Sequence, residues 1–262
     1  MGEKQIPADV IKEIELSILD YIDDVCKTNH IKYYLAYGTL LGAIRHKGFI
    51  PWDDDIDIYL LRDDYMKFVK IVNEQRNDRY EILSIYNDDS YNYEFAKVID
   101  KRTALNASNF IINKKEGVWV DVFPLDYTSK FIKLQKTFIN LFVACRILSV
   151  YRSFPSDKRN ICFYPLWIIS KYVGPRFFLR LTDKLAMMGN NKTKVGYMAS
   201  MGVSKFFFPS SWCNEVCVVD FEGRKLPAFK CYNEYLSYQY GDYMQLPPED
   251  KRISHPVEAY WR

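Results

Sequence analysis

The chain has 262 residues and a formal net charge of +3, and hydrophobic residues make up 48% of it. This length allows one large domain, and the hydrophobic share supplies a full core, which argues against a disordered chain. No apolar run reaches the ~18 residues typical of a transmembrane helix, and the first ten residues lack the apolar stretch of a signal peptide. The six cysteines have no regular spacing, so reduced thiols are expected. We therefore predict a cytoplasmic protein.

Apolar periodicity divides the first 128 residues into helices and strands. The expected elements are helices over residues 9–27, 40–47 and from 63 onward, and strands over 32–36, 55–59, 81–86, 93–99, 110–112 and 118–123. Asp9, Thr39 and Asp63 are the expected N-caps, because short polar side chains accept hydrogen bonds from the free N–H groups of a helix start. This order predicts an α+β fold, a mixed sheet with flanking helices.

The chain changes character after residue 128. Residues 129–204 are basic and apolar, with helices expected over 137–150 and 162–173, and no Gly/Ser linker precedes them. We therefore predict a basic helical lobe inserted after a core formed by residues 1–128. A strand over 216–221 and a helix over 233–240 belong to the C-terminal segment 205–262, which is expected to pack on that core.

A run of carboxylates over residues 53–58 is the densest chemical feature of the sequence. Side chains alternate between the two faces of a strand, so Asp55 and Asp57 are expected to point the same way, and Asp53 is close enough to join them. Neighbouring carboxylates repel each other unless a cation or a proton lies between them, and hard oxygen ligands suit Mg²⁺ or Mn²⁺. The spacing therefore predicts a divalent metal site on a strand.

A solvated turn and a calcium loop are two other interpretations of the acidic run. It is acidic enough to be a solvated turn, although it leads into an apolar alternation and not into more polar loop. The spacing of its aspartates also matches a calcium loop, but Ile58 stands where that loop needs glycine.

A further carboxylate, Asp121, lies between Trp119 and Phe123 in the predicted strand 118–123. It is either a sheet-edge residue that caps a loop or a third metal carboxylate, with general base as a second possible role.

The segment before the acidic run has the features of a phosphate site. Gly38 allows a tight turn from strand to helix, and Thr39 lies at the helix start, where free N–H groups attract an anion. Arg45 and Lys47 follow at the other end of the short helix and suit further phosphate contacts. Cations at a helix C-terminus are favourable without any ligand, so a solvated helix end is an equal alternative for these two residues.

Taken together, these motifs resemble a known family. Residues 37–58 resemble the signature of the LicD family, whose relatives include fukutin and fukutin-related protein, and the likeness extends to residues 119–126 and 240–248. It spans roughly residues 30–125 and 205–256 and leaves the middle of the chain, about 130–195, without a family signal.

The resemblance implies a nucleotidyltransferase-like fold and a phosphotransferase. Its expected reaction is transfer of phosphocholine from CDP-choline to a hydroxyl of a lipid-linked glycan precursor of the teichoic-acid or lipopolysaccharide type, with release of CMP. Another CDP-alcohol, of ribitol or glycerol, is the alternative donor. The implied catalytic and metal residues are Asp55, Asp57 and Asp121. Trp52 and Trp119 are candidates to bind the quaternary ammonium by cation–π attraction.

Two functions other than catalysis remain as alternative interpretations of the sequence. A non-catalytic glycan-binding protein is disfavoured by the complete set of three carboxylates. A nucleic-acid-binding protein is disfavoured because the sequence has no recognition-helix, RRM or zinc-finger pattern, so no nucleic-acid partner is expected.

The segment from residue 130 to residue 194 holds 13 lysines and arginines and only two acidic residues. It is also rich in aromatic side chains, and its apolar runs are too short to span a bilayer. Such a segment either forms an ordinary helical lobe with solvated cations or lies on an anionic membrane surface. The second interpretation predicts a peripheral protein at the inner face of the membrane.

Overall fold

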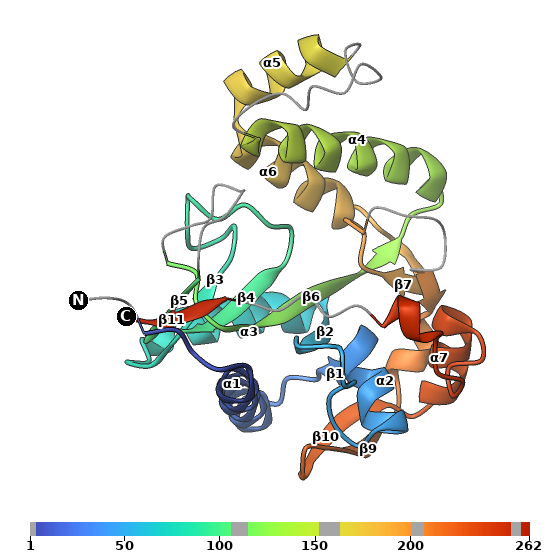
Figure 1. The fold of residues 1–262 in the computed structure, drawn as a ribbon. Helices are drawn as coiled ribbons and strands as arrows, with labels where there is room; N and C mark the ends of the chain where they lie inside the picture. The colour runs from blue at the N-terminus through green and yellow to red at the C-terminus, as the bar shows by residue number, and fades with distance from the viewer. Residues whose placement is uncertain (1–3, 106–114, 152–162, 201–206, 253–257) are drawn as a thin grey trace.

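A mixed sheet runs through the centre of the molecule (Figure 1). The computed structural model describes residues 4–105, 115–151, 163–200, 207–252 and 258–262. The strands of this sheet are β1 (Tyr34–Leu35), β2 (Asp57–Leu61), β3 (Tyr80–Leu83), β4 (Ala96–Asp100), β6 (Trp119–Thr128), β7 (Asn191–Gly196) and β8 (Phe207–Pro209). Their order is β1-β2-β6-β4-β3, and β7 pairs with the far end of β6 and carries β8 on its other edge.

Only β2 and β6 run parallel, and the other described pairs of this sheet are antiparallel. Two small antiparallel pairs complete the strands: β9 (Val216–Phe221) with β10 (Arg224–Phe229), and β5 (Thr103–Leu105) with β11 (Ala259–Trp261). The last pair joins β11, near the C-terminal end of the sequence, to β5 of the core. The α+β fold class with a mixed sheet is confirmed.

The described helices fall into three groups. They are α1 (Ala8–Thr28), α2 (Tyr37–Arg45) and α3 (Arg62–Gln75) in the core, α4 (Ile132–Val150), α5 (Tyr164–Val173) and α6 (Pro175–Ala186) in the lobe, and α7 (Tyr232–Tyr240) in the tail, with 3₁₀ helices η3 (Ser210–Cys213) and η4 (Glu249–Lys251). Helices α1 and α3 pack on strands of the sheet, and α4 to α6 stack on one another at one side of it (Figure 1). Of the residues with described structure, no helix is long and apolar enough to cross a bilayer.

The predicted N-caps are wrong. Pro7, Ala36 and Leu61 occupy the cap positions of α1, α2 and α3, and none of these helix starts has a side-chain cap hydrogen bond. Asp9 and Asp63 lie within the first turns instead, where a carboxylate is stabilised by the helix dipole without capping. Local sequence therefore located these starts to within a turn but not their hydrogen bonds.

The observed ends of several strands also differ from those predicted from the apolar periodicity. Strand β3 ends at Leu83 because Ser84 begins a turn, in which its N–H and hydroxyl both donate to Asn87 Oδ1. Strand β6 continues past Phe123 to Thr128, since it is paired on one side by β2 and then by β7. The predicted strand at 110–112 lies outside the described residues. Helix α6 and the strands β5, β7, β8, β10 and β11 were not predicted.

Candidate active site

Three charged side chains stand in register across three neighbouring strands. In the parallel pair Asp57 of β2 lies opposite Asp121 of β6, and in the antiparallel pair Lys97 of β4 lies opposite the same Asp121. Adjacent strands are about 4.8 Å apart, so the three side chains share one face of the sheet at close range. All three are buried, with exposed fractions of 9%, 8% and 5%. The sheet therefore holds a carboxylate pair with one ammonium beside it.

The remaining aspartates of the acidic run lie in the loop just before β2. The strand begins at Asp57, so Asp53 and Asp55 are in that loop and are half-buried. Asp53 reaches the start of α2, where its carboxylate lies against Gly38; a Cβ at Gly38 would collide with Asp53 Oδ2. Glycine is thus needed here for a close approach of a carboxylate, and the expected strand-to-helix turn is made instead by Tyr37, at φ 40°.

Thr39 has a different role from the one predicted. It is buried within α2, and its hydroxyl oxygen accepts a hydrogen bond of 2.8 Å from the backbone N–H of Asp57. This bond ties the short helix to the first residue of β2 and satisfies an amide that would otherwise be unpaired in the interior. Thr39 therefore positions the carboxylate strand and does not cap α2.

The site carries more negative than positive charge. Glu15 of α1 is buried beside the acidic run, and burial, followed by the charges of Asp55 and Asp54, raises the pKa of this carboxyl well above its usual value. The compensating cations are Lys12, whose Nζ donates to the Asp53 backbone oxygen at 3.1 Å, and the buried lysine of β4. Six acidic side chains thus face two lysines.

This excess shows in the ionisation of the aspartates. Burial, followed by repulsion from Asp55, raises the pKa of Asp53 to about 7. Burial and then the charges of Asp55 and Asp121 raise the pKa of Asp57 well above its usual value. Burial also raises the pKa of Asp121 to about 6, although Lys97 opposes the shift. Carboxylates held this way favour an added cation or protons.

The carboxylate oxygens of this site are chemically suited to bind a divalent cation. Asp121 Oδ1 is buried without a hydrogen-bond partner and lies 3.7 Å from Lys97 Nζ, so it retains capacity for a further ligand. Hard carboxylate oxygens are the ligands that Mg²⁺ and Mn²⁺ prefer. Within the described part of the chain, no three acidic, histidine or cysteine side chains meet as a ready-made metal site.

A cavity of about 700 Å³ adjoins the acidic loop, between α2 and the C-terminal tail. Arg45 and Trp52 both line it, so the structure brings together two of the predicted ligand-binding residues. Tyr240 of α7 lines it too; burial of its hydroxyl and the charge of Asp57 raise the pKa of this tyrosine, although 42% of the whole residue is exposed. The cavity therefore adjoins the acidic loop through Trp52 and Tyr240, although its described lining includes none of the site's carboxylates.

Arg45 and Lys47 differ in their surroundings. The guanidinium of Arg45 donates a hydrogen bond of 2.8 Å to the backbone oxygen of Tyr243 and so fixes the tail against α2. Lys47 is in the left-handed conformation at φ 63°, and its backbone oxygen accepts from the N–H of Glu222 in the β9–β10 hairpin. Lys47 is not among the described residues that line the cavity.

The two tryptophans each face a cation of the protein itself. Lys97 Nζ lies 3.8 Å from the ring centre of Trp119, and the guanidinium of Arg252 lies 5.3 Å from that of Trp52. The rings of Tyr93 and Phe95 are 4.8 and 5.9 Å from the same lysine. The predicted ability of Trp119 to bind a cation is thus used by Lys97 in this structure.

Sequence reasoning missed several residues of the site. Lys97 and Glu15 are separated from the acidic run by about 40 residues in either direction, and only sheet pairing and helix packing bring them close. One signal was available for Lys97, a lone lysine inside the apolar strand 96–100. A charge at such a position needs a partner, because burying it unpaired is costly.

The fold and site together define a nucleotidyltransferase-type domain that presents paired carboxylates from adjacent strands. The family described as LicD/FKTN/FKRP, nucleotidyltransferase domain, matches residues 30–157. The chain is also 33% identical over 256 residues, 94% of each chain, to the lipopolysaccharide cholinephosphotransferase LicD of Haemophilus influenzae. The chain therefore belongs to the LicD family and is a transferase.

Shorter likenesses reach other relatives. An uncharacterized protein of Rickettsia prowazekii is 36% identical over 92 residues, which are 35% of this chain and 30% of that protein. The mouse ribitol 5-phosphate transferase FKRP is 41% identical over 44 residues, 17% of this chain and 9% of that protein. These matches confirm the predicted family resemblance.

Proposed function

We propose that the chain transfers phosphocholine from CDP-choline to a hydroxyl of a lipopolysaccharide- or teichoic-acid-type glycan precursor, with release of CMP. The observation that supports this most is the buried pair Asp57 and Asp121, aligned on adjacent strands among further acids. Buried like charges are costly to fold, so their presence favours a catalytic role over a passive glycan-binding one. The long likeness to a cholinephosphotransferase supports choline as the alcohol.

Asp55, Asp57 and Asp121 would hold a divalent cation, Mg²⁺ or Mn²⁺, with Asp53 close by. Bound there, the cation would neutralise charge on the donor pyrophosphate and on the departing CMP. The chain's own contribution is positional: Thr39 fixes the start of β2 through the Asp57 amide, and the aligned strands fix the spacing of the carboxylates. Failing a second cation, Asp121 is the candidate general base for the acceptor hydroxyl, because its Oδ1 has no hydrogen-bond partner among the described residues.

The cavity beside the acidic loop is the proposed donor site. Arg45 at its wall is suited to phosphate, while Trp52 is suited to a ring or a quaternary ammonium. CDP-ribitol or CDP-glycerol remains the alternative donor, since the likeness to a ribitol 5-phosphate transferase includes 44 residues of the chain.

The test is CMP release from a panel of CDP-choline, CDP-ribitol and CDP-glycerol, with a lipopolysaccharide acceptor and Mg²⁺. We expect CDP-choline to be preferred, EDTA to stop the reaction, and Asp57→Asn to lower the rate by at least about 100-fold, because charge stabilisation in the site is worth a few kcal/mol. Asp78→Asn, an exposed acid outside the site, is the matched control. Turnover that is indifferent to EDTA, or retained by Asp57→Asn, would refute the proposal.

A further inference from the structure

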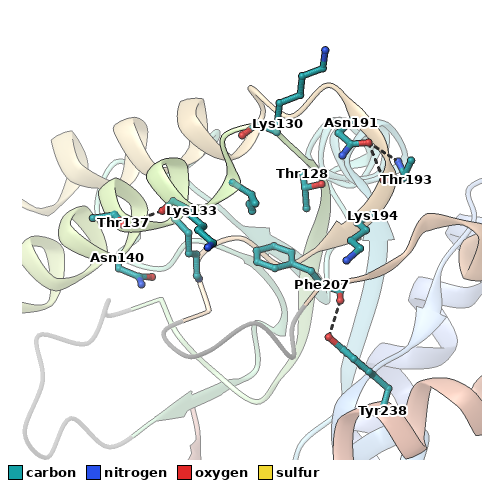
Figure 2. Close-up of a pocket in the computed structure, with 13 residues that line it drawn as sticks. Thr128, Lys130, Lys133, Thr137, Asn140, Asn191, Thr193, Lys194, Phe207 and Tyr238 are labelled. Atoms are coloured by element: carbon teal, nitrogen blue, oxygen red, sulfur yellow. Dashed lines mark hydrogen bonds between the residues drawn. The ribbon is translucent and has the colours of Figure 1, made fainter.

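A second cavity, of about 900 Å³, lies between the helical lobe and the tail, away from the acidic site. It is lined by the end of β6, the first turns of α4, strand β7 and one aromatic residue each from β8 and α7. We call it the lysine groove; its residues are Thr128, Ser129, Lys130, Ile132, Lys133, Lys136, Thr137, Asn140, Asn191, Thr193, Lys194, Phe207 and Tyr238. Figure 2 shows Phe207 between the α4 side chains and Lys194.

The lysine groove is positively charged without compensation. None of its described lining residues is acidic, and four are lysines. Lys136 is already used, because its Nζ donates to the backbone oxygens of Met198 and Ser200. Lys133 and Lys194 form no ion pair with any residue that the structure describes, and both are exposed to a ligand. Such a surface attracts anions.

Two buried polar atoms in the groove have no partner. Ser129 Oγ and Asn140 Oδ1 are shielded from solvent, yet neither forms a hydrogen bond within the described chain. Buried polar groups are almost always paired, so an ordered water, or a ligand that displaces the side chains covering these atoms, would complete them. The hydroxyls of Thr137 and Thr193 donate to the Lys133 backbone oxygen and to Asn191 Oδ1, and their oxygens can still accept from sugar hydroxyls.

The groove cannot serve the same phosphates as the acidic site. Asp121 and Thr128 are seven residues apart on one strand, and at a rise of about 3.3 Å per residue they are separated by roughly 23 Å. A ligand that reaches both must be long. An oligosaccharide acceptor has that length, the hydroxyls for the orphan atoms, and a face for the rings of Phe207 and Tyr238.

We propose that the lysine groove binds a phosphorylated saccharide, namely the part of the glycan acceptor that lies beyond the reacting hydroxyl. Lysine ammoniums bind phosphate as compact point charges, which favours phosphate groups on the sugar. This inference rests on the proposed function in one respect only, the identification of the bound saccharide as the acceptor of the reaction. The binding itself requires no turnover.

The test is a calorimetric titration with a phosphorylated lipopolysaccharide core oligosaccharide and with the same oligosaccharide after phosphatase treatment. We expect the phosphorylated form to bind at least about tenfold more tightly, a ratio that falls with salt because the charges are screened. In Lys133→Glu/Lys194→Glu the ratio should fall to about one. The control Lys70→Glu/Lys184→Glu changes the net charge equally on exposed residues outside the groove and should keep the ratio.

Asn140→Leu tests the orphan amide. It should weaken both forms about fivefold, the effect of one hydrogen bond, and leave their ratio unchanged. The titration contains neither a CDP-alcohol nor a divalent cation, so a failure of CMP release does not affect this measurement.

Equal binding of the two oligosaccharides by the parent protein, or a ratio preserved in the groove variant, overturns the proposal. So does a groove variant that loses binding to phosphatidylglycerol vesicles and keeps its oligosaccharide affinity, because lipid headgroups would then be the ligand.

Discussion

Asp57, Asp121 and Lys97 show how single residues carry the chemistry of the site. Each is a charged residue in a buried strand, where an apolar side chain would be cheaper. Their energies depend on one another: the lysine offsets part of the repulsion between the two aspartates, and it is held in place by the rings around it. These three residues are therefore coupled, and removing the charge of one changes the electrostatic energy of the other two.

This coupling predicts a non-additive pair of substitutions. Lys97→Met leaves Asp121 buried beside other acids without its nearest cation, and we expect about 3–5 kcal/mol lower stability, measured by urea unfolding. In an Asp121→Asn background the same substitution removes only the attraction between Lys97 and Asp57, so its cost should be clearly smaller, about 1–2 kcal/mol. Equal losses in both backgrounds would show that the lysine acts through packing alone.

Helix α3 joins the helical lobe to the core through one arginine. Arg62, its first residue, donates to both carboxylate oxygens of Asp126 on β6, at 2.7 and 2.6 Å, and to Asp183 on α6 at 2.9 Å. The three side chains are nearly buried, with 13%, 2% and 12% exposed. A planar guanidinium can bind both oxygens of one carboxylate and still donate to a second, a fixed fork geometry that a lysine ammonium does not have. The lobe is thus fixed by a specific polar contact.

This contact predicts a large effect of truncation. Arg62→Met leaves Asp126 buried and unpaired, and we expect a loss of about 3–5 kcal/mol in urea unfolding. Arg62→Lys keeps the charge but not the fork, so an intermediate loss is expected. Lys70→Met, an exposed position of the same helix, is the control and should change stability by less than about 0.5 kcal/mol. A loss below about 1 kcal/mol in Arg62→Met would contradict this account.

The molecule as a whole is polarised in charge and in apolar exposure. Residues 130–194 carry a net +11, while the rest of the chain carries −8. In the same lobe, α5 buries only Ser170 and exposes Ile169 and Tyr172 at 58% and 95%. Apolar side chains open to water in a segment with a net positive charge suit an anionic lipid surface.

We therefore expect the chain to co-sediment with vesicles that contain phosphatidylglycerol, and less so at high salt, because each lysine or arginine near such a surface contributes about 1 kcal/mol that salt screens. Ile169→Ser/Tyr172→Ser should weaken binding severalfold. The control Val218→Ser/Met244→Ser removes apolar side chains outside the lobe that are also largely exposed, at 65% and 56%. Unchanged binding by the α5 variant, or equal binding to neutral vesicles, would argue against a membrane role.

At each scale, the sequence by itself determined what depends on neighbours in the chain. Alternation around the aspartates placed Ile56 and Ile58 in the core, and a dense run of aspartates marked the acidic site. Family motifs over residues 37–58 identified the class of enzyme. These features are local, so a one-dimensional pattern is enough to carry them.

The tertiary structure alone decided what depends on distant segments. The pairing of β4 with β6 placed Lys97 beside Asp121, the Asp57 amide took the Thr39 hydroxyl that was predicted to cap a helix, and Asp53 filled the space at Gly38. Strand β7 returned from the lobe to extend the sheet and so formed a wall of the lysine groove. The reason is common to all: a buried charge or amide takes its partner from whatever the fold brings near, and sequence order does not record that distance.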